Sequence, residues 1–129
     1  GEGATKLVEI QVGGARTPSQ ARKVGKSIAN SPLVKTALFG NDPNWGRILC
    51  AAGYSGVAID QDRLALTLCG YPLVREGEPV EYDEATVSRA MRAPEVLIQL
   101  ELGQGSAAST VWTCDFSYDY VRINAEYTT

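Results

Sequence analysis

The stretch Asn41-Asp42-Pro43-Asn44-Trp45-Gly46-Arg47-Ile48 divides the chain, because two short helical patterns precede it and strand patterns dominate after it. It predicts the start of a helix: Asp42 suits the N-cap and Pro43 suits the first helical position. We expect Gly53 to end this helix in a left-handed conformation. Its apolar stripe is predicted to consist of Trp45, Ile48, Leu49 and Ala52.

A strand and two helices are predicted before this stretch. Residues 5–12 alternate between apolar and polar side chains, the period of a half-buried strand, and Gly13-Gly14 is expected to end it. Residues 17–20 form a capping box with proline at the first helical position, and Ser31-Pro32 repeats the polar cap and proline. The predicted buried stripes are Ala21, Val24, Gly25, Ile28 and Ala29 in the first helix and Leu33, Val34, Ala37 and Leu38 in the second.

The second half of the chain predicts strands and two more helices. Residues 64–69 and 71–75 are expected strands, and Asp83 is expected to cap a helix. Residues 95–102 and 107–114 are two long alternating runs joined by Gly103-Gln104-Gly105, which predicts a hairpin. A terminal helix is expected to carry Phe116, Tyr120, Ile123 and Tyr127. Together these elements predict an α+β fold with an antiparallel or mixed sheet and packed helices.

Composition narrows the class of protein. The chain has 129 residues and a net charge of -3, and its pI is about 4.9. An acidic chain with scattered Lys and Arg is unsuited to nucleic acid or an anionic membrane as its main partner. No apolar run approaches the ~20 residues that span a bilayer, and no signal-peptide pattern is present, so we expect a cytoplasmic protein.

Cysteine and histidine usage limits the chemistry. Cys50, Cys69 and Cys114 are far apart in apolar patterns, which predicts buried thiols. The absence of histidine removes Ser-His-Asp and Cys-His triads and most zinc chemistry. The acidic residues between 76 and 84 lack the spacing of a calcium loop. We therefore expect no metal site and no cofactor.

Two terminal segments remain ambiguous on physical grounds alone. GEGATK (1–6) lacks the spacing of a nucleotide-binding loop. Glu2 would suit an ammonium group, but sequence physics alone favours a solvated turn residue. NAEYTT (124–129) has the character of a fraying helix end. The chain starts without Met and enters a strand pattern almost at once, which predicts that it is part of a larger protein. The residues by themselves indicate an α+β domain and do not identify its function.

Five separated motifs, in order, resemble the ornithine acetyltransferase family. They are GEGATK (1–6), SPLVKTA (31–37), NDPNWGRI (41–48), GYSG (53–56) and NAEYTT (124–129). The resemblance implies the C-terminal part of a β chain, made when a precursor cleaves itself before a threonine. The α and β chains of this family assemble as an α2β2 heterotetramer.

The resemblance also implies an activity. The new N-terminal Thr is the nucleophile, as in N-terminal-nucleophile hydrolases and related aminopeptidases and amidases. It transfers acetyl by a ping-pong route from N-acetylornithine to glutamate, giving ornithine and N-acetylglutamate for arginine biosynthesis. A Thr activated by its own amine or a nearby water needs no imidazole base, which fits the missing histidine.

Three substrate-binding residues are implied by motif position. Glu2 matches the family's binding glutamate, Asn124 its binding asparagine, and Thr129 its last residue, whose free carboxylate adds a second anion. No nucleophile is expected in this chain, so it has no catalytic residue of its own. Residues 1–56 would complete the nucleophile-bearing domain and residues 57–129 a C-terminal α+β domain. We expect structural or interface roles for Asp42, Trp45 and Arg47.

Other functions remain open on the sequence. An amidase or aminopeptidase of the same architecture would release the acyl group to water. A non-catalytic binding or assembly module would act without an upstream partner. Nothing in these residues decides whether acetyl-CoA also serves as donor, or whether a specialised pathway uses a related acyl donor.

Overall fold

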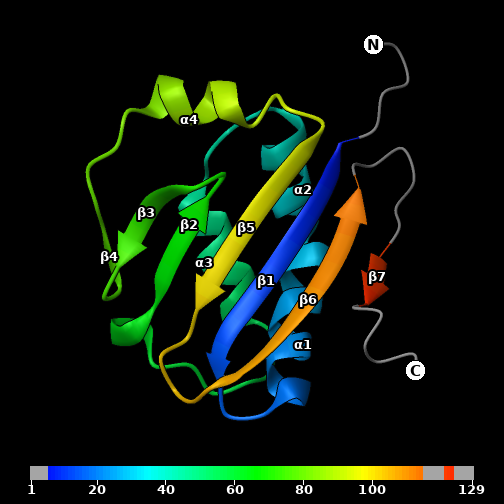
Figure 1. Ribbon diagram of the computed structural model, residues 1–129, viewed down its shortest axis with the longest axis vertical. Coiled ribbons are helices and arrows are strands. Elements are labelled where there is room, and N and C mark those ends of the chain that lie inside the picture. Colours follow the sequence, from blue (N-terminus) through cyan, green and yellow to red (C-terminus); the bar gives the residue numbers. More distant parts are fainter. Residues whose placement is uncertain (1–5, 115–120, 124–129) are drawn as a thin grey trace.

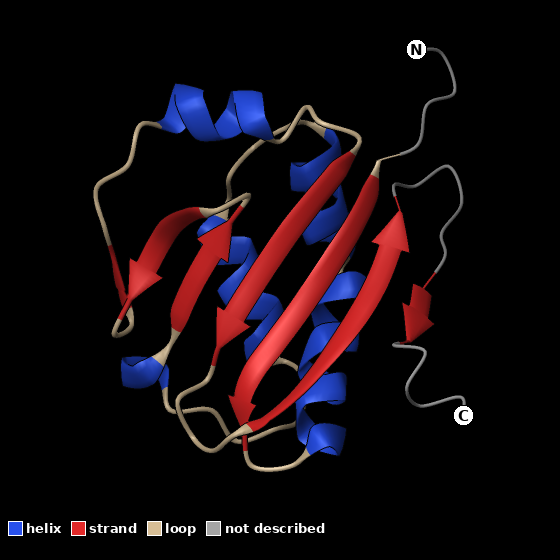
Figure 2. Ribbon diagram, viewed as in Figure 1, coloured by secondary structure: helices blue, strands red, loops and turns tan. Residues whose placement is uncertain are grey.

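The computed structural model describes residues 6–114 and 121–123. Within these residues, seven strands form one mixed sheet in the order β4-β3-β2-β5-β1-β6-β7 (Figure 2). β1 pairs in parallel with β5, and the other neighbours are antiparallel. The strands are β1 (Leu7–Ala15), β2 (Ala65–Leu68), β3 (Tyr71–Arg75), β4 (Glu78–Pro79), β5 (Glu95–Glu101), β6 (Ala107–Cys114) and β7 (Val121–Ile123).

Helices cover one face of this sheet, which confirms the predicted α+β class. α1 (Pro18–Ala29), α2 (Pro32–Phe39) and α3 (Trp45–Gly53) lie behind the sheet in Figure 1, and α4 (Glu84–Ala90) lies beyond its upper end. A short 3-10 helix, η1 (Gln61–Arg63), precedes β2. The core forms between the helices and alternate strand residues, including the fully buried Ile10, Val24 and Ile28.

The opposite face of the sheet is polar at its centre. Gln99 Nε2 donates to Gln11 Oε1 at 3.1 Å, and Gln11 Nε2 donates to Glu9 Oε2 at 2.7 Å. No helix of the described part of the chain covers this face (Figures 1 and 2). These side chains therefore provide one another with hydrogen-bond partners on a partly exposed surface.

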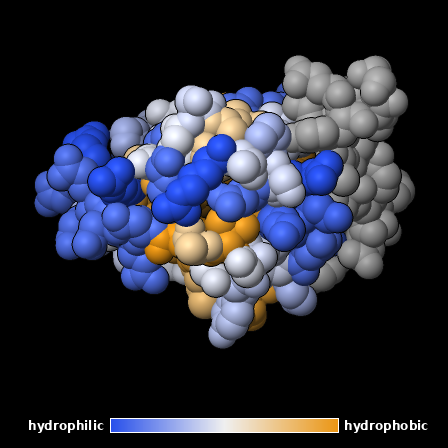
Figure 3. Space-filling view, turned by 90° about the horizontal axis from the view of Figure 1, so that it is seen from below, coloured by the Kyte–Doolittle hydropathy of each residue, from blue (hydrophilic) through white to orange (hydrophobic). Residues whose placement is uncertain are grey.

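The end of the molecule at which β1 finishes is mainly hydrophilic around a smaller apolar patch (Figure 3). Among residues 6–114 and 121–123, no helix has both the length and the apolar character that crossing a bilayer requires.

Two predicted helix starts are confirmed. Thr17 Oγ1 accepts from Gln20 N at 3.1 Å, and Ser31 Oγ accepts from Val34 N at 3.2 Å. The predicted stripe of α1 is buried in full. In α2, Val34, Ala37 and Leu38 are buried as predicted. The prediction for Leu33 is wrong: this residue is 60% exposed, and Lys35, which is 4% exposed, is buried in its place.

The predicted start of α3 is also wrong. The helix begins at Trp45, and the N-cap is Asn44, whose Oδ1 accepts from Arg47 N at 3.1 Å. Asp42 N donates to Ala37 O at 2.8 Å, so residues 41–43 complete the turn that closes α2 and cannot enter the next helix. Gly53 is the last helical residue and has no left-handed conformation.

The predicted hairpin of residues 95–114 is wrong, because β1 lies between β5 and β6. Alternating side chains show that a strand has one buried face but not which strand lies beside it. Gly14 has a φ of 69° in a bulge, which carries β1 past its predicted end to Ala15. Leu102 N donates to Gly13 O at 2.9 Å and Gln104 N donates to Gly14 O at 2.7 Å, so the β5–β6 loop passes across the end of β1.

The predicted terminal helix is wrong at residues 121–123, which form β7 and pair with β6. Pairing with the edge of β6 gives the backbone N–H and C=O groups of this segment hydrogen-bond partners, whereas an isolated helical turn is costly to nucleate. The other residues of that prediction, Phe116, Tyr120 and Tyr127, lie outside the described residues.

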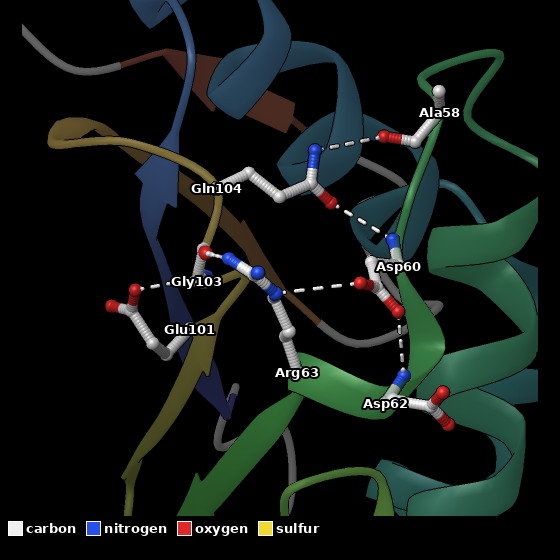
Figure 4. A network of polar contacts seen from close by, with 7 residues as sticks. All are labelled: Ala58, Asp60, Asp62, Arg63, Glu101, Gly103 and Gln104. Atoms are coloured by element: carbon white, nitrogen blue, oxygen red, sulfur yellow. Dashed lines mark hydrogen bonds and ion pairs between the residues drawn. The ribbon is translucent and has the colours of Figure 1, made fainter.

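Hydrogen bonds join the segment after α3 to the β5–β6 loop (Figure 4). Gln104 accepts from Asp60 N at 2.9 Å through Oε1 and donates to Ala58 O at 3.0 Å through Nε2. Arg63 Nη1 donates to Gly103 O at 2.9 Å and pairs with Asp60 at 3.4 Å. The division into residues 1–56 and 57–129 stays a prediction.

Candidate functional site

Two of the recognised motifs meet where the chain enters β1. Lys6 Nζ donates to Leu38 O at 2.6 Å and to Asn41 Oδ1 at 2.5 Å. Lys6 ends the GEGATK motif, and Asn41 begins NDPNWGRI. The ammonium group therefore joins the residue before β1 to the turn between α2 and α3.

Asn41 is the centre of this junction. It has a φ of 56°, a left-handed conformation that asparagine tolerates better than most residues. Its backbone N–H donates to Leu38 O at 3.2 Å, and its backbone carbonyl accepts from Ser88 Oγ of α4 at 2.8 Å. Contacts from Lys6 just before β1, from α2 and from α4 thus fix one turn residue.

The third motif, SPLVKTA, contacts the same region. Arg47 Nη1 donates to Leu33 O at 3.1 Å, which joins α3 to the first turn of α2. Tyr82 OH donates to Pro43 O at 3.4 Å. A largely apolar hollow of about 350 Å³ lies between these helices; its lining is Ser31, Leu33, Asn44, Gly46, Arg47, Cys50, Ala51 and Tyr54.

Two titratable groups near these elements have shifted pKa values. Burial, with smaller contributions from the carboxylates of Glu84 and Asp42, raises the pKa of Tyr82. Burial also raises the pKa of the Cys69 thiol, against a weaker opposing effect of a backbone hydrogen bond with Leu97 and the charge of Lys6. Both groups are therefore held protonated and neutral more strongly than in a free chain.

The predicted burial of the three cysteines is only partly correct. Cys114 is buried and Cys69 is half-buried, but Cys50 is exposed, because it points away from the buried side of α3 into the hollow. Within residues 6–114 and 121–123, no three His, Cys, Asp or Glu side chains gather in a way that could hold a metal ion.

The predicted binding residues Glu2, Asn124 and Thr129 lie outside the described residues. The sheet register describes the positions that lead to them. Val8 pairs with Thr113, and Thr113 pairs with Val121, so these three residues form one row across β1, β6 and β7. Glu2 is six residues before this row along the chain and Asn124 is three residues after it. Because β1 and β7 are both antiparallel to β6, they run in the same direction, so the chain leaves this row toward Glu2 and toward Asn124 in opposite directions.

Sequence reasoning missed the roles of Lys6, Asn41 and Ser88. Lys6 was part of a recognised motif, and its position at the start of a predicted strand was a signal that it could contact a neighbouring element. Ser88 carried no such signal, because it lies in α4, 47 residues from Asn41 in sequence.

A mixed sheet with helices on one face, in which two of the recognised motifs meet beside the start of β1, defines an α+β protein. The sequence model of the ArgJ family matches residues 1–129, and the chain belongs to the ArgJ family. The resemblance seen in the motifs is thereby confirmed.

Named relatives agree with this assignment. The chain is 50% identical over 129 residues to "Arginine biosynthesis bifunctional protein ArgJ" of Shouchella clausii and 51% identical over 134 residues to "Glutamate N-acetyltransferase" of Methanosarcina mazei. Both comparisons cover 100% of this chain but 32% and 34% of the relatives, so the chain spans about a third of their length.

A solved structure supports the fold. The crystal structure of the arginine biosynthesis bifunctional protein ArgJ from Bacillus halodurans is similar with a TM-score of 0.86 and 40% sequence identity. The similarity covers 93% of this chain and 57% of that one.

Proposed function

We propose that this chain is the C-terminal part of the β chain of a glutamate N-acetyltransferase. The complete enzyme would transfer acetyl from N2-acetylornithine to glutamate, giving ornithine and N-acetylglutamate in arginine biosynthesis. The observation that carries the proposal is the 50–51% identity, over the whole of this chain, to relatives named ArgJ and glutamate N-acetyltransferase.

The reaction has two balanced halves, and its nucleophile is outside this chain. A threonine hydroxyl attacks the acetyl carbonyl of N-acetylornithine and its proton passes to a base. The base returns this proton to the amide nitrogen as the C–N bond breaks, which releases ornithine. The amine of glutamate then attacks the acetyl-threonine ester and restores the hydroxyl. Backbone amides suit the stabilisation of both tetrahedral oxyanions.

The proposed task of this chain is to bind the amino-acid part of the substrate. Glu2 would hold an amino group of ornithine through a charge-assisted hydrogen bond, and the amide of Asn124 would both donate and accept. The terminal carboxylate of Thr129 would add a second anion.

The proposed partners are the α chain and the upstream part of the β chain in an α2β2 heterotetramer. We propose a cytoplasmic enzyme without nucleic acid or membrane as a partner, in keeping with its acidic composition. Size measurement by light scattering tests the assembly: a mass below that of two α and two β chains would contradict it.

Mass spectrometry of the assembled chains tests the activity. Brief exposure to N-acetylornithine is expected to add one acetyl group to the β chain, and added glutamate is expected to remove it. An enzyme that is cleaved and assembled but never acquires this adduct would refute the proposal. Loss of the adduct to water as fast as to glutamate would instead identify an amidase.

Glu2→Gln and deletion of Thr129 test the binding roles. Each change is expected to raise the KM for N-acetylornithine while leaving self-cleavage intact. Glu2→Gln removes a negative charge from the proposed pocket, and deletion of Thr129 draws the terminal carboxylate back by one residue. Unchanged kinetics in either variant would remove that residue from the site.

A further inference from the structure

We propose that the face of the sheet opposite the helices is the surface on which the upstream part of the enzyme packs. This open face consists of the side chains of β2, β5, β1 and β6 that point away from the helices, and its occupant presents Lys or Arg side chains to it. The proposal rests on the proposed function only in treating this chain as one part of a longer enzyme. It does not depend on which reaction that enzyme catalyses.

The sheet register places four uncharged polar side chains in one row across the open face. Thr67 pairs with Gln99, and Gln99 pairs with Gln11. Gln11 in turn pairs with Thr110, so the row crosses β2, β5, β1 and β6. Amide and hydroxyl groups cost less to remove from water than charged groups do. The centre of the open face therefore has the depletion of charge that is found at the core of protein interfaces.

A partly apolar row lies beside the polar one. Leu97 and Trp112 are the neighbours of Glu9 on β5 and β6, and all three residues are half-buried. Leu7, which points to the same face at the start of β1, is 39% exposed. Aromatic residues are enriched at protein interfaces relative to the rest of the surface. This row therefore offers apolar area that a second layer can remove from water.

Small side chains leave a trough in the open face. Its volume is about 400 Å³, and Ala65 and Ala108 line it together with the residues of the polar row. Alanine side chains end close to the backbone, so another element can approach the strands here. Because packed layers of a protein fill such gaps, the trough suits large side chains from a second layer.

The charge of the open face selects the kind of occupant. The strands β1, β2, β5 and β6 contain no Lys or Arg, whereas Glu9, Glu95 and Glu101 place three carboxylates on this face. A second copy of the same face would bring identical carboxylates together, which costs free energy. Nucleic acid or an anionic membrane would likewise add negative charge. A different protein surface with Lys or Arg side chains is the complementary partner.

The upstream part of the enzyme is the occupant that we assign. Most of such an enzyme lies outside this chain, which covers 32% and 34% of the named relatives and 57% of the solved ArgJ chain. The helices α1, α2 and α3 already cover the other face of the sheet (Figure 1). The open face is therefore the sheet surface that remains for the rest of the enzyme to cover.

Thiol labelling of the full-length, self-cleaved enzyme tests whether the open face is covered. Gln99 is exposed in this chain, so the thiol of Gln99→Cys would react readily with a maleimide if the face met only water. We expect it to react at least about tenfold more slowly in the native enzyme than after unfolding. Ser19→Cys, at an exposed position of α1, is the matched control and is expected to stay within about threefold of its unfolded rate.

Peptide mapping separates these thiols from Cys50, Cys69 and Cys114. Labelling is repeated at higher pH, because neighbouring carboxylates slow a thiol by raising its pKa and this effect fades as the thiol ionises, whereas coverage does not. A Gln99→Cys thiol that reacts in the native enzyme within about threefold of its unfolded rate would overturn the proposal.

A charge variant tests the basic character of the occupant. Glu9→Gln removes the charge and keeps an oxygen that can accept from Gln11 Nε2. Added to Gln99→Cys, it is expected to raise the native labelling rate about twofold to fivefold, because a partly exposed ion pair is worth up to about that factor. Glu81→Gln, at an exposed position away from the open face, is the control and is expected to change nothing. Equal effects of the two variants would contradict a basic occupant.

Photo-cross-linking identifies the occupant. A photoreactive side chain introduced at position 99 of the assembled enzyme is expected to join the upstream part of the enzyme on illumination. Cross-links to the strands of a second copy of this chain, or no cross-link, would overturn the proposal.

The outcomes distinguish the docking surface from the proposed reaction. An enzyme that acquires the acetyl adduct but labels Gln99→Cys at its unfolded rate would overturn only the docking surface. A protected Gln99→Cys thiol in an enzyme that never acquires the adduct would defeat only the reaction.

Discussion

Replacing Gly14 by alanine is expected to destabilise the protein by about 3 kcal/mol. The φ of 69° at Gly14 costs an alanine about 1–2 kcal/mol. The added Cβ would overlap Glu101 Oε2 and lie 2.6 Å from Gly103 N. The carboxylate can swing away, but the Gly103 backbone is held in the β5–β6 loop, and such overpacking costs about 1–3 kcal/mol more.

Gly13→Ala provides a matched control one residue away. Gly13 has no positive φ, and its added Cβ would lie 3.1 Å from Glu101 Oε1, the movable end of an exposed side chain. We expect a loss below about 1 kcal/mol, the usual range of a change that meets no rigid obstacle.

Thermal melting of the assembled enzyme measures the difference. At about 2–4 °C per kcal/mol, Gly14→Ala is expected to lower Tm by about 6–12 °C and Gly13→Ala by less than about 4 °C. Adding Glu101→Ala should rescue only the side-chain part of the Gly14→Ala loss. Equal Tm values for the two single variants would refute the bulge and close-approach reasoning.

Three further predictions concern the core and the titratable groups. Ile10→Ala, at a fully buried position of β1, is expected to lower the free energy of unfolding by about 2–5 kcal/mol in a denaturant titration. Exposed Cys50 should react with iodoacetamide before half-buried Cys69, whose raised pKa leaves less thiolate at a given pH; peptide mapping that finds Cys69 modified first would contradict this. Because the pKa of Tyr82 is raised in the fold, its contribution to stability is present below pH ~10 and is lost as pH rises through the folded pKa. Difference spectra against Tyr82→Phe should therefore show ionisation above pH ~10, and an ordinary midpoint would count against its burial.

Local patterns predicted local structure well. Local interactions determine the caps at Thr17 and Ser31 and the buried stripe of α1. The residues involved lie within a few positions of one another, so a short stretch of sequence is enough to predict them. The cap of α3 was misplaced because residues 42 and 43 belong to the turn that ends α2, where Asp42 N donates to Ala37 O. The sequence pattern of one helix does not show the hydrogen bonds that the preceding helix needs at its end.

Long-range neighbours could not be predicted in the same way. The runs that form β5 and β6 alternate as expected, but their partner β1 is more than 80 residues away in the pairing of Gln11 with Gln99. The motifs predicted a binding region, and the contact of Lys6 with Asn41 brings two of them together. The roles of Glu2, Asn124 and Thr129 stay predictions.

The position of β1 between β5 and β6 has a consequence for synthesis on the ribosome. β1 emerges before its parallel partner β5, which follows about 88 residues later. At a synthesis rate of about 5–20 residues per second, β1 lacks this neighbouring strand for roughly 4–18 s. During this interval α1, the next segment to emerge, is the nearest cover for the apolar side of the strand, so weakening α1 would expose nascent chains to aggregation even where the finished enzyme tolerates the change.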